Sequence, residues 1–156
     1  MSDIKHILVP TDGSEGSLKA AGVAGDMARA LGARVTVLLV QDERFVLSEA
    51  WNTASASASP QNLSGGVEEA REAMERKAAT TELAATTKAL GDVPEGAQGV
   101  QVWGHPADQI CGYAKENGID MIIMGSYGRS RLMRAMLGSV SRGVANAAPC
   151  AVTVVP

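Results

Sequence analysis

The sequence predicts a single α/β domain built on an open, mostly parallel β-sheet with helices on both faces. The length of 156 residues suits one domain and leaves little room for a second. Short apolar segments alternate regularly with longer amphipathic ones, a pattern typical of right-handed βαβ crossovers. The short segments are almost continuously apolar, as expected for strands that helices cover on both sides.

The first half of the chain predicts two strands and one helix. Residues 4–10 form the first apolar segment. Residues 14–31 carry apolar side chains at helical spacing, with Ser14 as N-cap and Gly32 as the stop. Residues 34–40 are rich in β-branched side chains and predict the second strand. Residues 44–66, which include a Ser/Ala repeat, are predicted to be a flexible loop, serving either as a lid or as a docking segment.

The second half continues the alternation. Residues 67–90 predict a long helix, 91–99 a turn and 100–103 a short third strand. Pro106 begins a helix that Gly118 ends, and residues 119–124 form the fourth strand. Residues 125–138 are rich in Gly and Arg and predict part loop and part short helix. A helix over 139–147 and a fifth strand over 150–155 complete the domain.

Composition excludes several classes of protein. The chain is 46% hydrophobic and 20% charged, which fits neither a disordered tail nor a membrane protein. The longest apolar stretches are strand-sized and no signal peptide follows Met1, so we expect a soluble, cytoplasmic protein without membrane insertion. Cys111 and Cys150 form no CxxC motif and are interpreted as small buried hydrophobic residues, not as metal ligands or a disulfide framework.

Charge and aromatic content argue against nucleic-acid binding. Aromatic residues make up 3% of the chain, which leaves few platforms for base stacking. The net charge is −3, yet four arginines and no acidic residue follow Gly125, so this segment carries +4 and the remainder −7. One small basic segment does not supply the broad phosphate contacts that duplex binding needs. It suits a small anion, although a solvated arginine face is an equally good explanation of the charge alone.

A glycine motif follows the fourth strand. Gly125, Gly128 and Gly138 have the spacing G-x2-G-x9-G, and Ser139 comes next at the start of a helix. Glycines let the backbone approach an anion, and the free amides of a helix start favour negative charge, with the Ser139 and Ser141 hydroxyls as further donors. The alternative is a set of turn glycines with an N-cap serine. The second Gly-Ser and the position after a central strand, where parallel sheets bind ligands, favour the anion site.

With this spacing, G-x2-G-x9-G-[ST], the sequence resembles the ATP-binding members of the universal stress protein family. The resemblance covers nearly the whole chain, including residues 7–14, Gly104-x-Pro106, residues 120–125 and the closing residues 148–156. Tyr127 and Arg131 depart from the residues common in the family, outside the signature itself. No GxxxxGK[ST] or GxGxxG motif is present, and Gly22 and Gly25 lie inside a helix.

The resemblance implies a Rossmann-like fold of the adenine nucleotide alpha hydrolase type with strand order 3-2-1-4-5. It further implies a homodimer joined antiparallel through Val152–Val155 and a regulatory role in stress, exerted on an unknown protein partner. The implied ligand is ATP with Mg or Mn, or else AMP or another adenine nucleotide.

The implied site residues come from four strand ends. Asp12 would meet the ribose or a phosphate-bound metal ion, above a floor of Pro10 and Thr11, and the Val40 backbone would meet the adenine edge. An ordinary helix-entry aspartate is the alternative for Asp12. The remaining implied residues flank the ribose (Met124, Gly125, Ser126) or hold the phosphates (Gly128, Arg129, Gly138, Ser139, Val140, Ser141).

Other polar residues give weaker signals. His105 follows the third strand at the correct edge, but Gly-His-Pro also makes a good turn. His6 lies at the opposite edge and is expected to be a structural or a surface residue. Only Asp12 and Asp42 offer carboxylates near the site, so no base for efficient phosphoryl transfer is evident. Two alternatives to a nucleotide-binding regulator therefore stay open, a slow ATPase or adenylate hydrolase and a nucleotide-free dimeric interaction module.

Overall fold

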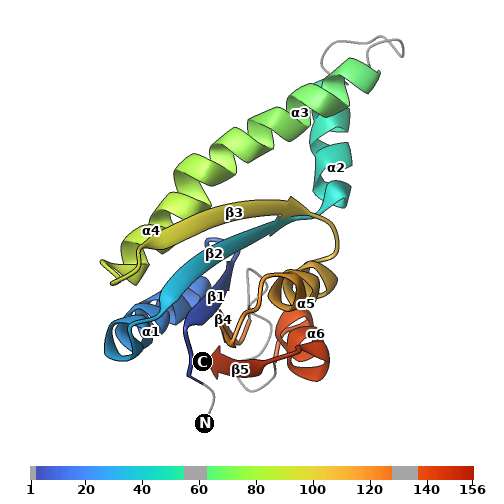
Figure 1. Cartoon of the computed structure of the whole chain (residues 1–156). Helices are drawn as coiled ribbons and strands as arrows, with labels where there is room; N and C mark the ends of the chain where they lie inside the picture. Colours follow the sequence, from blue (N-terminus) through green and yellow to red (C-terminus); the bar gives the residue numbers. More distant parts are fainter. Residues whose placement is uncertain (1–2, 55–62, 128–136) are drawn as a thin grey trace.

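The computed structural model describes residues 3–54, 63–127 and 137–156. Its five strands form one parallel sheet in the order β3-β2-β1-β4-β5, which confirms the predicted fold class (Figure 1). Strands β2 and β3 are added on one side of β1, and strands β4 and β5 on its other side, so strand order reverses between β1 and β4. The strands are β1 (His6–Thr11), β2 (Arg34–Gln41), β3 (Ala97–Trp103), β4 (Met121–Gly125) and β5 (Ala151–Val155).

Two apolar layers pack on the sheet, one on each face. Alternate strand residues such as Ile7 and Val9 pack with the alanines of α1 (Glu15–Leu31) and with Leu90 of α4 (Ala84–Leu90). On the opposite face Leu8 packs with side chains of α5 (Pro106–Glu116) and α6 (Ser139–Ala147). Small side chains on α1 let this helix lie close to the sheet, which is why its buried face consists mainly of alanine.

The predicted helix signals of α1 are confirmed. The Ser14 side chain accepts a hydrogen bond from the amide of Ser17, and Gly32 ends the helix in the left-handed conformation with φ 67°. Gly25 is a packing glycine, because a Cβ added there would lie 2.1 Å from the carbonyl oxygen of Leu90.

The prediction of a flexible loop over residues 44–66 is wrong wherever the structure describes this segment. Residues Glu43–Ala54 form helix α2, and α3 (Leu63–Ala78) already includes residues 63–66; residues 55–62 lie outside the described chain. The Ser/Ala composition suggested a loop, but alanine favours a helix, and Val46 gives this segment a buried apolar side chain. The two helices lie side by side and extend beyond the edge of the sheet (Figure 1).

Two further boundaries differ from the sequence prediction. Strand β3 begins at Ala97, inside the predicted turn, because Ala97–Gly99 pair with Val35–Val37 of β2. These residues are exposed, so backbone pairing defines the strand where no apolar pattern marks it. The predicted helix 67–90 is interrupted by a π-helical segment, η2 (Ala79–Leu83), before α4.

Two glycines of α1 provide a matched pair of substitutions. Gly25→Ala should lower the free energy of unfolding by about 2 kcal/mol, because its Cβ would collide with the Leu90 carbonyl and push α1 from α4. Gly22→Ala should raise the free energy of unfolding by about 0.5–1 kcal/mol. A Cβ there meets nothing within 4 Å, and alanine has less backbone entropy to lose than glycine when the helix forms. Urea unfolding of both variants measures the difference; equal effects would contradict the packing described.

Candidate functional site

The carboxyl ends of β1 and β4 and the start of α1 meet through direct backbone contact. A Cβ added to Gly125 would lie 2.9 Å from the carbonyl carbon of Gly16. A Cβ added to Gly16 would in turn lie 2.9 Å from the carbonyl oxygen of Tyr127. Glycine at both positions therefore lets the first turn of α1 rest on the end of β4, at the point where strand order reverses.

The start of α6 is fastened to the same strand end. The amide of Gly138 donates to the carbonyl of Ser126 at 2.7 Å, and Gly138 is the N-cap of α6. The amide of Ser126 donates to the carbonyl of Val155 at 2.9 Å, which ties in β5. Gly125, Ser126 and Gly138 thus lie together, and Ser139 and Val140 follow Gly138 as the first residues of α6. Gly128 and Arg129 lie outside the described residues.

Ser141 has a different role from the predicted phosphate contact. Its side chain is buried, and its hydroxyl donates to the carbonyl oxygens of Gly125 at 2.8 Å and Ser126 at 3.0 Å. A hydroxyl has one proton, so this donor is committed to the backbone. Ser141 therefore positions the turn after β4, whereas the exposed Ser139 lies at the start of α6, where helix amides lack intrahelical partners.

Asp12 follows β1 at the same edge. Its Oδ1 accepts hydrogen bonds from the Ser14 amide at 2.9 Å and the Ser17 hydroxyl at 2.8 Å, so its carboxylate is fixed by the start of α1. A carboxylate oxygen is a ligand that Mg and Mn accept. The described residues hold no group of three His, Cys, Asp or Glu side chains suited to a metal ion, so Asp12 would need other oxygen donors beside it.

Three predicted residues lie on one face of the sheet. Val40 and Met124 belong to the apolar layer under α5 and α6, and Pro10 shares that face because it alternates with Val9. Val40 is half-buried, whereas Met124 is buried. Thr11 points to the opposite face, where its hydroxyl lies 2.7 Å from that of Thr86. Pro10, Val40 and Met124 thus share one face of the sheet, which we call the apolar floor, and Thr11 lies on the opposite face.

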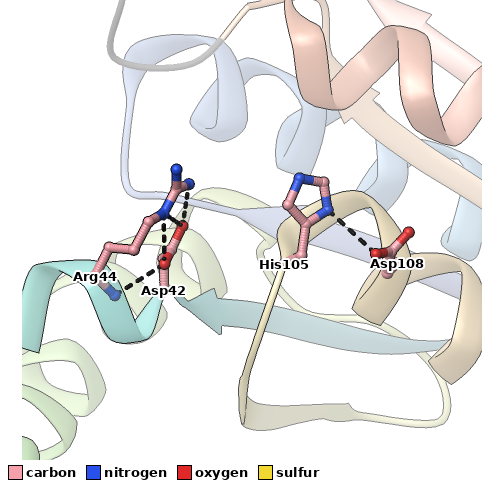
Figure 2. A network of polar contacts seen from close by, with 4 residues as sticks. All are labelled: Asp42, Arg44, His105 and Asp108. Atoms are coloured by element: carbon pink, nitrogen blue, oxygen red, sulfur yellow. Dashed lines mark hydrogen bonds and ion pairs between the residues drawn. The ribbon is translucent and has the colours of Figure 1, made fainter.

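A charged cluster occupies the ends of β2 and β3 (Figure 2). The Arg44 guanidinium and amide both contact the Asp42 carboxylate, with Nε 2.8 Å from Oδ2. These hydrogen bonds lower the pKa of Asp42 to about 2. His105, the exposed N-cap residue of α5, has Nδ1 3.5 Å from Asp108 Oδ2. Asp42 is therefore an ion-paired carboxylate and is poorly suited to accept a proton.

Comparison with known proteins identifies the family of this chain. The sequence model described as the universal stress protein family matches residues 3–156. The chain belongs to the universal stress protein family. Universal stress protein YxiE of Bacillus subtilis is 32% identical over 151 residues, covering 96% of this chain and 97% of that protein.

Structural comparison extends the likeness to the fold. The structure of MJ0577, a universal stress protein of Methanocaldococcus jannaschii, superposes with a TM-score of 0.81 at 28% identity, over 99% of this chain and 96% of that one. A universal stress protein solved in complex with cAMP shares the fold at a TM-score of 0.60 and 24% identity, over 99% and 98% of the two chains. One from Archaeoglobus fulgidus in complex with dAMP does so at 0.57 and 21%, over 99% and 100%.

Other sequence predictions have mixed outcomes. The Trp103 ring lies under the Arg71 guanidinium, whose Cζ is 4.6 Å from the ring centroid, and its Nε1 donates to Glu75 Oε1 at 2.7 Å. Cys111 and Cys150 are only partly buried, and burial raises the pKa of both thiols. Within the described ranges, no helix is long and apolar enough to cross a membrane.

Two residues without a recognised motif reach the site from the helical layer. Glu82 and Thr86 lie beside Gly13 and Thr11 respectively. The sequence marks this helical irregularity only indirectly. Ala78 and Leu83 are five residues apart, a spacing that a regular α-helix does not place on one face, yet both are buried in the same apolar layer.

A hollow of about 420 Å³ lies at the opposite, amino end of the sheet. His6, Arg34, Thr36, Tyr113 and Asn117 are among its lining residues. The buried His6 ring places Nε2 2.8 Å from the Thr36 hydroxyl, which confirms a structural role. Neither the glycine motif nor Asp12 is part of this hollow, so it is separate from the candidate site.

His6 should make stability depend on pH. Burial, reinforced by the Arg34 charge and opposed by that of Asp120, lowers its pKa below the ordinary value of 6.5. As pH falls from 7.5 to 5.5, the unfolded chain binds a proton that the folded protein resists, so the free energy of unfolding should decrease. His6→Gln should flatten this dependence in urea titrations, and His105→Gln, at an exposed position, should leave it unchanged. An unchanged slope in His6→Gln would contradict the assignment.

Proposed function

We propose that this universal stress protein binds ATP at the carboxyl ends of β1 and β4, together with Mg or Mn, and acts as a nucleotide-dependent regulator. The carrying observation is the backbone junction of Gly16, Gly125, Ser126 and Gly138, which joins the starts of α1 and α6 to the end of β4 at the reversal of strand order. Ligands of open parallel sheets bind at this position.

The junction offers a different surface to each part of a nucleotide. Pro10, Val40 and Met124 give an apolar floor for a base, next to main-chain groups at the end of β2. The unpaired amides at the start of α6, with Ser139, suit phosphate oxygens. In this proposal Gly128 and Arg129 complete the phosphate contacts, as the family motif implies. The cAMP and dAMP complexes of proteins with this fold support an adenine nucleotide as the ligand class.

The metal ion would be shared between protein and ligand. Mg usually keeps few protein ligands and takes its remaining oxygens from phosphates and water. Asp12 is the residue we assign to it, directly or through water. The lack of a three-residue metal cluster among the described residues is compatible with a metal ion that arrives bound to the nucleotide.

The site favours holding ATP over cleaving it rapidly. Phosphoryl transfer to water benefits from a residue that orients or deprotonates the nucleophile. Of the two carboxylates expected near the site, Asp12 is bound by Ser14 and Ser17, and Asp42 is paired with Arg44. The carboxylate of Glu82, which the structure adds beside Gly13, accepts a hydrogen bond from the Thr81 hydroxyl. Slow hydrolysis of ATP, or of an adenylated substrate, is therefore the second candidate function.

Nucleotide content and affinity test the proposal. Protein purified without added nucleotide and then denatured should release ATP on ion-exchange chromatography, and calorimetry with Mg-ATP should show saturable binding to the emptied protein. Released ADP or AMP would favour the hydrolase. An empty protein that binds no added Mg-ATP would overturn the proposal and leave the nucleotide-free interaction module.

The Asp12 assignment gives a specific mutational test. Asp12→Ala should weaken Mg-ATP binding about tenfold or more, because a charged contact at the polyphosphate end is lost. Asp26→Ala, which removes an exposed α1 carboxylate paired with Arg29, should bind Mg-ATP as the unmodified protein does. Equal affinity of Asp12→Ala and Asp26→Ala would contradict the role of Asp12.

We also propose a homodimer formed by antiparallel pairing of Val152–Val155 of β5 with its copy. β5 is an edge strand with only part-buried side chains from Val152 to Val155, and a free edge invites a further strand. In a two-fold pairing centred on β5, its middle residue Thr153 meets its own copy.

Thr153→Glu should dissociate this dimer, because two like charges would face each other across the axis. Sedimentation equilibrium should give twice the chain mass of 16.1 kDa for the unmodified protein and a single chain mass for Thr153→Glu. Thr153→Val, which keeps the shape of the side chain, should remain a dimer. A monomeric unmodified protein would contradict the proposal.

A further inference from the structure

The β1–α1 loop is held from two sides. On the side of α1, the Ser14 amide and the Ser17 hydroxyl donate hydrogen bonds to Asp12. On the other side, the loop contacts Glu82 of η2 and Thr86 of α4, which are distant in the sequence. This second support lies on the sheet face opposite the apolar floor and belongs to no part of the glycine motif.

The second support depends on the π-helical turn. In η2 and the turn before it, the Thr80 hydroxyl donates to the Arg76 carbonyl at 3.0 Å and the Thr81 hydroxyl to the Lys77 carbonyl at 2.6 Å. Such side-chain bonds compete with the regular amide ladder of a helix. The wider turn places the buried Leu83 in the same apolar layer as Ala78, five residues earlier, and directs Thr86 and Glu82 toward β1.

The hydrogen bonds between the turn and the loop have one consistent direction. The Thr86 hydroxyl donates to the Glu82 carbonyl at 2.7 Å, so toward Thr11 it acts as an acceptor. The Thr11 hydroxyl therefore donates to Thr86 at 2.7 Å and accepts from the Gly13 amide at 3.1 Å. The result is a relay of three hydrogen bonds, from the Gly13 amide through Thr11 and Thr86 to the Glu82 carbonyl. Thr86 is fully buried, where such a chain is strongest.

The Glu82 side chain also packs against the loop, at Gly13. Gly13 has φ 76°, and a Cβ added there would lie 2.6 Å from Glu82 Cγ. The Glu82 stem therefore packs directly on the main chain of Gly13, one residue after Asp12. Only glycine accommodates both this backbone angle and this contact.

We propose that Thr86 and Glu82 are positioning residues of the nucleotide site: their relay and packing set the Thr11–Gly13 loop so that Asp12 meets the polyphosphate and its metal ion. This inference rests on the proposed function. It assigns the π-helical turn a role in ligand affinity that is separate from the glycine motif.

Valine and serine at position 86 separate the relay from packing. Thr86→Val keeps the side-chain shape but removes the acceptor of the Thr11 proton, and Mg-ATP affinity measured by calorimetry should fall about tenfold. Thr86→Ser keeps the hydroxyl and should restore most of the affinity. Thr87→Val, at the exposed neighbouring position, controls for a threonine-to-valine change on α4 and should bind normally.

A double-mutant cycle and an amide probe identify the route of the effect. If both threonines act through one relay, the affinity loss in Thr11→Val/Thr86→Val should be clearly smaller than the product of the two single losses. The Gly13 amide resonance should shift in Thr86→Val and stay in place in Thr87→Val. Multiplicative losses, or an unmoved Gly13 resonance, would overturn the relay.

The outcomes distinguish this inference from the proposed function. If the unmodified protein binds Mg-ATP and Thr86→Val binds it equally tightly, the inference fails and the proposed function stands. If the unmodified protein binds no Mg-ATP, the proposed function fails and the ligand role of the relay fails with it.

Discussion

The contact between the first turn of α1 and the end of β4 is the constraint on which the candidate site depends. Gly16 and Gly125 approach so closely that a Cβ on Gly125 would meet main-chain atoms of Gly16 at 2.9 Å and 3.0 Å. This contact fixes how far the ends of β1 and β4 stand apart. The Gly138 amide and the Ser141 hydroxyl then attach α6 to the same strand end. Two helix starts and two strand ends are thereby joined mainly through backbone atoms.

A backbone junction of this kind suits a regulator that holds its ligand. Amides and carbonyls in fixed positions lose little conformational entropy when a ligand binds, because the turns that carry them are already ordered. The side chains around the junction have structural hydrogen bonds: Ser141 bonds to carbonyls, Thr11 to Thr86, and Asp12 to Ser14 and Ser17. Asp42 is similarly paired with Arg44 after β2, and His105 lies 3.5 Å from Asp108 after β3 (Figure 2). Asp12 and Asp42, the two carboxylates that the sequence places at this edge, are thus both held in hydrogen bonds.

The helices outside the sheet connect to this junction through α3. Trp103 at the end of β3 bonds to Glu75, and Gln101 bonds to the Glu75 carbonyl at 3.1 Å, so α3 is fixed to the end of β3. The same helical segment continues through η2 to the Thr11–Gly13 loop. α2 lies along α3 and exposes Phe45, Leu47 and Trp51. The described parts of the segment whose composition suggested a loop, residues 44–54 and 63–66, thus belong to helices α2 and α3.

The sequence by itself determined the layered fold and the edge of the sheet at which we place the candidate site. Apolar runs such as residues 34–40 can be buried only between two helical layers, and the spacing of Gly125, Gly138 and Ser139 marks a backbone turn whatever surrounds it. Tertiary structure decided what local pattern does not encode. The Ser/Ala composition of residues 44–66 hid the helix of Glu43–Ala54, the Ser141 hydroxyl turned inward to carbonyls, and Thr11 met Thr86 across 75 residues of sequence. Each of these outcomes depends on which distant groups packing brings within hydrogen-bonding range, and periodicity along the chain carries no information about that.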